Sequence, residues 1–327
     1  MMDLSIPYYK DNTRVSNSAI GWFLNKGPSY FHKKLSGLVE DEITSAMDKG
    51  TMIHMYLLQP EEFINTYKVW TSAKPASDKQ EQFCIELANS VEIEPNRAIL
   101  SAFKKVYSTV NQTEDKMLSK GLEIASTLKD YIEWLKNKEY ELISPWQYKQ
   151  LQTIKSNVTS HKLASVLLNP TKGETHHEFH INWELNGVKC KSLLDSVNFD
   201  FDNKVCTLMD IKTTVKLWHF EDSINQYDYT RQLEFYTMAL NWYLKNERNE
   251  DPTKWKFKWY IIAIDTIDSN EVRVFKFSDE QITPVSIKIL YAIDRIKWHS
   301  DNNLWEHSRE YYDDDGAEEI SLESKNQ

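Results

Sequence analysis

The pattern of apolar and polar positions is clearest just past the middle of the chain, where it predicts a β-hairpin. Residues 188–199 and 204–212 are rich in β-branched and aromatic side chains, as strands usually are. The residues between them include Asp200, Asp202 and Asn203, which favour turns. We therefore expect two antiparallel strands joined by a short polar loop.

The register of this hairpin follows from its loop. If Asp202-Asn203 is a two-residue loop, counting outward places Asp195 directly opposite Asp210. Directly opposed residues share a face of the sheet, with Cβ atoms roughly 5 Å apart. Lys212 lies on that face too, because side chains alternate along a strand. One hairpin thus brings two carboxylates and one ammonium into a small volume.

Helical spacing of apolar residues dominates the first half of the chain. It predicts two short helices interrupted at Gly27-Pro28, a helix that ends near Pro60, and a helical region from about residue 78 to 168. Further helices are expected at 226–245 and 283–298, and further strands at 175–185, 255–265 and 271–277.

These patterns divide the chain into three parts. A turn-rich break at 169–173 separates a mostly helical portion, residues 1–170, from a core at 171–300. The remaining residues, 301–327, are polar and acidic, so we expect a disordered tail there.

Two opposed carboxylates repel each other, and burial adds to the cost of their charge. A divalent cation removes that repulsion, and carboxylate oxygens suit Mg²⁺ or Mn²⁺. A nearby lysine can then orient a water molecule or stabilise the charge on a phosphate. The arrangement therefore favours metal-assisted phosphodiester hydrolysis. The alternative is a surface hairpin whose acidic and basic side chains only pair with each other.

Composition and charge narrow the choice of function. Glycine is scarce and no Gly-rich phosphate loop occurs, which argues against NTPases and dinucleotide enzymes. The net charge of −10 is unusual for a protein that binds nucleic acid over a broad basic surface. Three cysteines without a CxxC spacing make a disulfide framework or a structural zinc site improbable.

The location of the protein is predicted from what the sequence lacks. The N-terminus has no signal-peptide apolar core, and no run approaches eighteen apolar residues. We therefore expect a soluble, cytoplasmic protein with no membrane association.

The hairpin also carries a recognisable signature. Leu194-Asp195, followed after a gap by Asp210-Ile211-Lys212, resembles the motif of the PD-(D/E)XK nuclease superfamily. Leu194 stands where that motif often has proline. The resemblance implies an α/β fold with a mixed central sheet flanked by helices, together with an N-terminal helical portion that completes the site.

A second motif lies in the helix that ends near Pro60. The sequence GT-x-x-H-x-x-x-L-x-P-E-x-F, which starts at Gly50 and contains His54, is similar to the N-terminal motif of exodeoxyribonuclease VIII-type phage exonucleases. That family uses the histidine as a metal ligand, and neutral imidazole is a plausible ligand beside two aspartates. The alternative is a histidine that is only part of an apolar helix and its packing.

Other candidate residues lie on either side of the hairpin. Glu178 is the acidic residue that the resembling family places on the preceding strand, as a metal ligand or as an exposed strand residue without that role. Strand alternation puts it on one face with His176 and His180, so a zinc site is an alternative there. Gln232 and Tyr236, one helical turn apart, resemble the Q-x-x-x-Y motif of RecB-like nucleases.

These resemblances together imply a two-metal exodeoxyribonuclease. Asp195, Asp210, His54 and the carbonyl of Ile211 would bind Mg²⁺ or Mn²⁺, and Lys212 would position the attacking water. Gln232, Tyr236 and Thr213 would contact the substrate. The alternative, favoured for Tyr236, is a helix whose tyrosines only pack on the sheet.

The resemblance further implies 5′→3′ digestion of linear double-stranded DNA in phage-type recombination, a ring-shaped homo-oligomer, and a partner that anneals single strands. Two alternatives stay open: a non-catalytic DNA-binding or scaffold protein with the same fold, and a sequence-specific endonuclease of the same superfamily.

Overall fold

The computed structural model describes residues 6–40, 45–107, 112–267, 269–313 and 315–316. The chain forms two compact units. Unit 1 consists of residues 1–59 and 153–327, and unit 2 of residues 60–152. This division differs from the predicted boundary at residue 170, because the helix that carries His54 packs against the central sheet.

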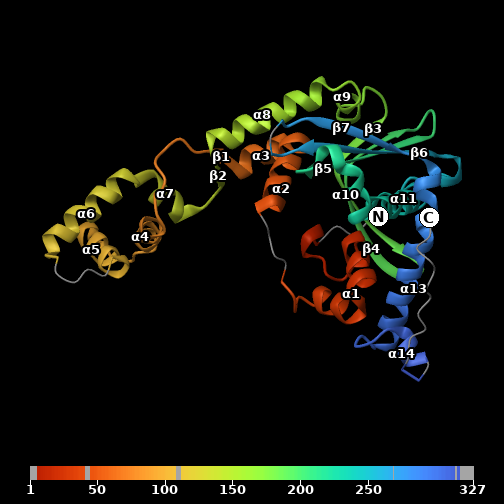
Figure 1. Ribbon diagram of the computed structural model, residues 1–327, viewed down its shortest axis with the longest axis horizontal. Helices are drawn as coiled ribbons and strands as arrows, with labels where there is room; N and C mark the ends of the chain where they lie inside the picture. Colours follow the sequence, from red (N-terminus) through yellow and green to blue (C-terminus); the bar gives the residue numbers. More distant parts are fainter. Residues whose placement is uncertain (1–5, 41–44, 108–111, 268, 314, 317–327) are drawn as a thin grey trace. The chain divides into compact units, whose positions relative to one another are not determined.

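Unit 1 is built on a five-stranded sheet with the strand order β3-β4-β5-β6-β7 (Figure 1). The strands are β3 (Glu174–Leu185), β4 (Val188–Asp200), β5 (Val205–Thr214), β6 (Lys256–Asp265) and β7 (Val272–Phe277). Only β5 and β6 pair in parallel, and the other neighbours are antiparallel. The mixed α/β architecture confirms the predicted fold class.

The helices of unit 1 come from distant parts of the sequence. They are α1 (Asn17–Leu35), α2 (Ser45–Leu58), α9 (Ala164–Leu168), α10 (Phe220–Gln226), α11 (Tyr229–Asn246), α12 (Asp279–Ile282), α13 (Ser286–Asn302) and α14 (Arg309–Asp313). Short 3₁₀ turns occur at Tyr8–Lys10, Leu217–His219, Pro252–Lys254 and Thr283–Val285. Helix α1 is kinked at Gly27, whose φ of 80° is accessible to glycine, so the predicted interruption is present.

Strand alternation divides the central strands between the two faces of the sheet. Cys206 and Leu208 of β5 belong to a core cluster that also contains residues of α1, α11 and α13. Met209 and Ile211, which are buried as well, point to the opposite face. Asp210 shares its face with Leu208, so its carboxylate points toward α11.

The β4–β5 connection confirms the predicted register but not the predicted loop. The strands end at Asp200 and resume at Val205, so the connection has four residues, Phe201–Lys204, instead of two. Asp200 accepts hydrogen bonds from the backbone and side chain of Asn203, which closes the turn. The pairs from Asp200↔Val205 to Ser196↔Met209 keep the counted alignment.

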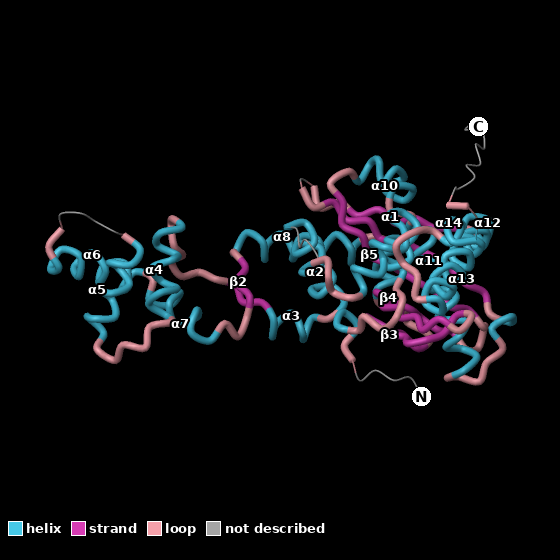
Figure 2. Tube along the Cα trace, turned by 90° about the horizontal axis from the view of Figure 1, so that it is seen from below, coloured by secondary structure: helices cyan, strands magenta, loops and turns pink. Residues whose placement is uncertain are grey.

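Unit 2 is mainly helical (Figure 2). It contains α3 (Pro60–Thr66), α4 (Asp78–Ala88), α5 (Pro95–Val106), α6 (Glu114–Thr127) and α7 (Lys129–Asn137), and α8 (Pro145–Ser160) begins in it. Strands β1 (Tyr67–Val69) and β2 (Glu141–Ile143) pair in parallel. Strand β2 was not predicted, because three residues are too few to show a period.

The C-terminal region differs from the expected tail over residues 301–313. Helix α13 extends to Asn302, and α14 follows. Trp305 stacks on His32 of α1 at a ring distance of 4.8 Å, and Tyr312 contacts Trp298. Aromatic packing therefore orders this stretch despite its polar composition. The expected tail at residue 314 and residues 317–327 lies outside the described residues.

Candidate functional site

Three carboxylates occupy one row across adjacent strands of unit 1. In the β3–β4 ladder, the pairs His177↔Ser196 and Phe179↔Leu194 flank Glu178 and Asp195. In the β4–β5 ladder, Ser196↔Met209 is the last pair before Asp195 and Asp210. Continuing both registers by one step aligns Glu178, Asp195 and Asp210 on β3, β4 and β5.

The backbone of Glu178 departs from a regular strand. Its φ of 49° lies in the left-handed region, which non-glycine residues seldom occupy. The regular pairing of β3 and β4 skips this residue, although the register continues unchanged on both sides. Such a conformation is typical of sites where geometry is held by the surrounding structure. It turns the Glu178 side chain toward the row.

Asp195 is held by two neighbours. The backbone N–H of Ile211 donates to its Oδ2 at 2.6 Å, and the same oxygen lies 3.4 Å from Nδ1 of His54. His54, Glu178 and Asp195 each offer one possible ligand atom, and these three atoms all lie within 4.8 Å of one another. The two sequence motifs, far apart in the chain, thus meet at one point.

Asp210 is almost completely buried, with 2% of its surface exposed. Its Oδ1 accepts a hydrogen bond from Nε2 of Gln232 at 3.0 Å, and the same amide group donates to the Tyr236 hydroxyl at 3.0 Å. Its Oδ2 lies 2.7 Å from Nζ of Lys212 but accepts no hydrogen bond of normal geometry from the described residues. Helix α11 therefore positions Oδ1 of Asp210, whereas Oδ2 is available to interact with cations.

The carboxylates of the row differ in their affinity for protons. Burial raises the pKa of Asp210 to about 6, with repulsion from Asp195 adding to the effect. Burial and Asp195 likewise raise the pKa of Glu178 to about 7. Burial acts on Asp195 too, but the His54 ring, the Lys212 ammonium and the Ile211 N–H outweigh it, so the pKa of Asp195 is lowered.

The cationic side chains respond in the opposite sense. Burial alone would lower the pKa of His54 and of Lys212, because it disfavours charge. The carboxylate of Asp195 outweighs burial at His54, and Asp210 with Asp195 outweighs it at Lys212, so both pKa values are raised. The row is an acidic centre whose charge is partly balanced by one imidazole and one ammonium.

Helix α2 brings His54 to the row through a close approach to β5. A Cβ added to Gly50 would lie 3.3 Å from Oγ1 of Thr213, which is tighter than most such contacts. Lys49 also donates a hydrogen bond to the backbone carbonyl of Thr266, which follows β6. The glycine of the GT-x-x-H motif therefore lets α2 lie close to the strand that carries Asp210.

The donor atoms fit a divalent cation. Carboxylate oxygens and one imidazole nitrogen are present together, a set that Mg²⁺ or Mn²⁺ accepts. The buried Oδ2 of Asp210 lies 2.7 Å from the Lys212 ammonium and accepts no hydrogen bond of normal geometry from the described residues, so it is an oxygen of the kind that a cation satisfies. His54, Glu178, Asp195 and Asp210 are thus the residues that could hold a metal.

Comparison with known families agrees with this geometry. The sequence profile of the family described as "PDDEXK-like domain of unknown function (DUF3799)" matches residues 16–311. The chain belongs to this family. The predicted membership of the PD-(D/E)XK superfamily is confirmed.

Solved structures support the fold of this PDDEXK-like protein. The crystal structure of a Eubacterium rectale protein, described provisionally as an exonuclease, is similar with a TM-score of 0.51 and 15% identity. The similarity covers 98% of this chain and 97% of the other, and at this identity it speaks to the fold alone. A structure described as SSO0001 has a TM-score of 0.21 and 12% identity over 76% of this chain and 88% of that one, too low to support an argument. No curated protein matches the chain.

The histidine-rich stretch of β3 does not form the alternative zinc site. The left-handed Glu178 breaks the alternation, and His176 stacks on Phe179 with ring centres 4.6 Å apart. His176 also bonds to Glu174 at 2.7 Å, while His180 bonds to Asn182 at 2.9 Å. Within the described parts of the chain, the cluster suited to a metal contains His54 instead.

Two further aromatic residues are associated with the row. Tyr229, the first residue of the sequence pattern Tyr229-x-x-Gln232-x-x-x-Tyr236, has its ring centre 5.0 Å from Nζ of Lys212. Sequence reasoning missed Tyr9, whose pKa is raised by burial and by the charges of Glu178 and Asp195. Tyr9 had no signal of its own, because a chain with seventeen tyrosines gives no reason to single it out.

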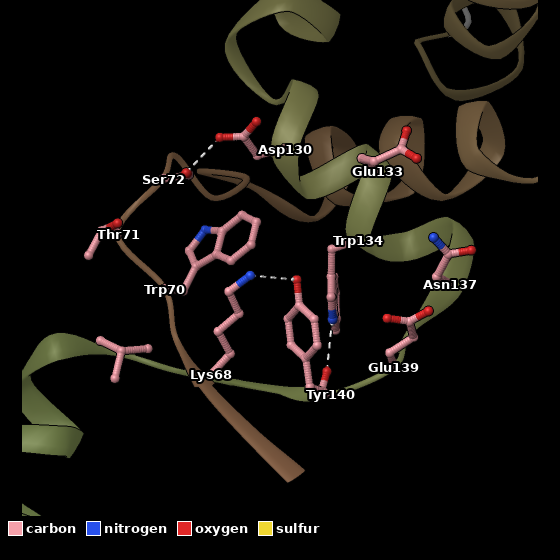
Figure 3. A pocket seen from close by; sticks show the side chains of 11 residues that line it. Lys68, Trp70, Thr71, Ser72, Asp130, Glu133, Trp134, Asn137, Glu139 and Tyr140 are labelled. Carbon is pink, nitrogen blue, oxygen red and sulfur yellow. Dashed lines mark hydrogen bonds between the residues drawn. The ribbon is translucent and has the colours of Figure 1, made fainter. Parts of the chain in front are cut away.

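Unit 2 of this PDDEXK-like protein contains a separate cavity of about 320 Å³ (Figure 3). Lys68 donates to the Tyr140 hydroxyl at 3.3 Å, and Nε1 of Trp134 donates to the Tyr140 carbonyl at 2.8 Å. Ser72 bonds to Asp130 at 2.7 Å. The bonds of Trp134 and Asp130 connect α7 to the segments next to β1 and β2, so the cavity walls have a structural role. Its carboxylates, which include Asp130, Glu133 and Glu139, make it unsuited to phosphate.

The described residues contain no helix that is both long and apolar enough to cross a lipid bilayer.

Proposed function

We propose that this PDDEXK-like protein is a divalent-metal-dependent deoxyribonuclease that removes nucleotides from the ends of linear double-stranded DNA. The observation that carries the proposal is the row of Glu178, Asp195 and Asp210, with Lys212 at 2.7 Å from Asp210 and His54 at 3.4 Å from Asp195. Carboxylates, a lysine and a histidine that converge in this way are suited to phosphodiester hydrolysis.

Each residue of the row has a distinct part in the proposal. Asp195 and Asp210, with His54, Glu178 and the carbonyl of Ile211, would hold Mg²⁺ or Mn²⁺. When bound, such a cation neutralises phosphate charge and makes water a stronger nucleophile at neutral pH.

Lys212 would orient the attacking water and offset the negative charge that develops on the phosphate. Its ammonium stays protonated because Asp210 and Asp195 raise its pKa despite burial. The water oxygen forms a bond to phosphorus, and the bond from phosphorus to the 3′ oxygen breaks. The products are a 5′ phosphate and a 3′ hydroxyl.

Gln232 and Tyr236 support this arrangement. Gln232 bridges Asp210 and the Tyr236 hydroxyl, so it fixes the carboxylate in one orientation. Tyr236 is 8% exposed, which favours a positioning role. Thr213, half-buried beside Gly50, would contact the substrate at the end of β5.

The preference for DNA ends and 5′→3′ polarity rests on the similarity of the His54 motif to exodeoxyribonuclease VIII-type exonucleases. His54 lies at the row, as that similarity requires. The same similarity supports a ring-shaped homo-oligomer, an annealing partner for the remaining single strand, a part in phage-type recombination and a cytoplasmic location.

Digestion of labelled DNA tests the proposal. Linear duplex DNA labelled at the 5′ end should lose its label as mononucleotides in Mg²⁺ or Mn²⁺, whereas a label at the 3′ end should stay in a long single strand. In EDTA both substrates should stay intact. A covalently closed circle of the same sequence should survive. Lys212→Ala should lower the rate about 100-fold or more. Lys216→Ala, at an exposed lysine beyond the end of β5, is the matched control and should keep the wild-type rate.

The outcomes separate the alternatives. Cleavage of the closed circle at defined positions would indicate a sequence-specific endonuclease. Binding without cleavage in every divalent cation would contradict the proposal and favour a non-catalytic scaffold. Equal rates for Lys212→Ala and Lys216→Ala would overturn the assignment of the row.

A further inference from the structure

Two aromatic side chains are strongly exposed on the segments that leave the row. Trp218 follows the C-terminal end of β5 and is 72% exposed, and Tyr227, between α10 and α11, is 57% exposed. Side chains of this size are usually buried at least in part. Both residues lie within unit 1, on the connection from β5 to α11.

Tyr227 is joined to Lys212 through one intermediate ring. It stacks on Tyr229 with ring centres 5.7 Å apart and planes inclined by 26°. The Tyr229 ring lies 5.0 Å from Nζ of Lys212. The exposed face of Tyr227 is therefore the outer end of a short stack that begins at the candidate reaction centre.

The corner that presents Tyr227 is rigid. Asp228 between the two tyrosines has a φ of 53°, and its carboxylate is bonded to Arg231 at 3.0 Å and Lys288 at 2.5 Å. Arg231 in turn bonds to the backbone and side chain of Asn17 in α1. Three elements thus fix this corner, so Tyr227 is held outward.

Trp218 belongs to the same aromatic network. The Arg273 guanidinium lies 5.1 Å from the Trp218 ring centre and 4.9 Å from that of Phe275. Phe275 contacts Phe220 at 5.0 Å, and Phe220 stacks on Tyr229 at 5.9 Å. Arg273 also donates to the Leu217 carbonyl, which holds the guanidinium beside the indole.

The charge of the protein limits how it can hold nucleic acid. A net charge of −10 gives little general attraction for phosphate. Stacking of bases on aromatic rings does not depend on net charge and contributes about 1–3 kcal/mol per base. An exposed indole with a guanidinium beside it offers both a stacking surface and a phosphate contact.

We propose that Trp218 and Tyr227 form a stacking surface for unpaired bases of a nucleic-acid strand. Arg273 would contact the phosphate backbone of that strand. This inference rests on the proposed nuclease function. It adds that the nucleic acid beside the reaction centre is single-stranded. Bases in a duplex hide their faces in the helix, so only an unpaired strand can use these rings. The duplex end therefore frays before its nucleotides reach Lys212.

Binding of single-stranded DNA in EDTA tests the surface without cleavage. The probe is a fluorescein-labelled oligothymidylate of about 20 nucleotides, enough for the expected contacts, followed by fluorescence anisotropy at low salt. Trp218→Ala and Tyr227→Ala should each raise Kd about 5- to 100-fold. Tyr227→Phe keeps the ring and should stay within about twofold of the wild type.

The matched control is Tyr291→Ala. Tyr291, on α13 of the same unit, is 50% exposed and has the Arg295 guanidinium 5.0 Å from its ring centre, so it repeats the local chemistry outside the connection from β5 to α11. It should bind like the wild type. If Trp218→Ala and Tyr227→Ala also bind like the wild type, the inference is overturned.

Two further measurements separate a stacking role from a structural one. Oligothymidylate should change the tryptophan emission of the wild type, and Trp218→Phe should remove most of that change. In the cleavage assay, Tyr227→Ala should raise KM for blunt duplex ends more than for ends with frayed, non-complementary tails, with kcat little changed. Wild-type cleavage with unaltered binding by the variants would refute this surface alone, whereas failure of the wild type to cleave refutes the nuclease function.

Discussion

At the scale of single residues, the two aspartates of the hairpin differ in pKa. Counting along the strands placed Asp195 and Asp210 together, but it treated them as equivalent repelling charges. In the structure His54 and the Ile211 N–H stabilise the charged form of Asp195, whereas burial disfavours charge on Asp210. Asp195 therefore keeps its charge to a lower pH than Asp210 does. Only the three-dimensional surroundings of each carboxylate determine this difference.

Removal of the His54 imidazole should weaken metal binding. His54→Ala takes away one donor of the cluster that also contains Glu178 and Asp195, so the cation concentration needed for half-maximal stabilisation should rise at least about tenfold. Melting temperatures measured over a range of MnCl₂ concentrations report this without requiring activity.

The exposed His307→Ala serves as the control and should show the wild-type concentration dependence. If His54 only packs against its neighbours, the variant would melt at a lower temperature in EDTA while its dependence on MnCl₂ stayed unchanged. That result would remove His54 from the metal site.

The conformation of Glu178 shows where prediction from sequence stops. Alternation in β3 predicts one face for His176, Glu178 and His180, but the left-handed φ at Glu178 breaks that pattern. Nothing in the neighbouring sequence, which contains no glycine or proline there, announces such a conformation. The residues around Glu178 in the folded protein impose this conformation. The sequence of β3 alone does not show which residues those will be.

At the scale of elements, long periodic segments were predicted well and short ones poorly. Helix α11 and strands β3, β6 and β7 lie within a few residues of their expected bounds, because each has enough apolar positions to show its period. Strand β2 has three residues, and its partner β1 lies far away in the sequence. Strand β2 forms because it pairs with this distant strand, and no local sequence pattern indicates such a pairing.

Helix α11 also carries a buried acid that the proposed chemistry does not use. Glu234 is 8% exposed, and burial raises its pKa from 4.5 to about 7. The folded protein therefore binds this proton more tightly than the unfolded chain, and the wild type loses stability as pH rises from about 4.5 to about 7. Glu234→Gln should be more stable than the wild type at pH 8, by about 1–2 kcal/mol, and similar near pH 4.5.

Denaturant unfolding at both pH values measures this difference. Glu221→Gln, at an exposed position of the neighbouring α10, should match the wild type at each pH. A Glu234→Gln variant that is no more stable than the wild type at pH 8 would show that the carboxylate is stabilised in its charged form.

For the whole molecule, the division into two units predicts separable stability. Gly121 of α6 packs against α5, and an added Cβ would lie 2.6 Å from Cγ2 of Ile99. A β-branched side chain cannot easily move this methyl group aside. Gly121→Ala should therefore lower the stability of unit 2 by about 1–3 kcal/mol, despite alanine's higher helix propensity.

Calorimetry with and without MnCl₂ can assign the effect. The cation-induced rise in melting temperature belongs to unit 1 and should persist in Gly121→Ala. Ser119→Ala, at an exposed position of the same helix, should unfold like the wild type. Loss of the cation effect in Gly121→Ala would mean that the two units do not unfold separately.

Unit 1 consists of two segments of the chain that unit 2 separates. This arrangement sets the order in which the residues of the candidate site are synthesised. Unit 2 is contained in residues 60–152, so all of it is available while β3 is still untranslated. His54 is synthesised first, and at about 5–20 residues per second Asp195 and Asp210 follow it after roughly 7–30 seconds. Nascent chains that stop early therefore carry the histidine without its carboxylates. The acidic centre can form only after β5, which carries Asp210, has been synthesised.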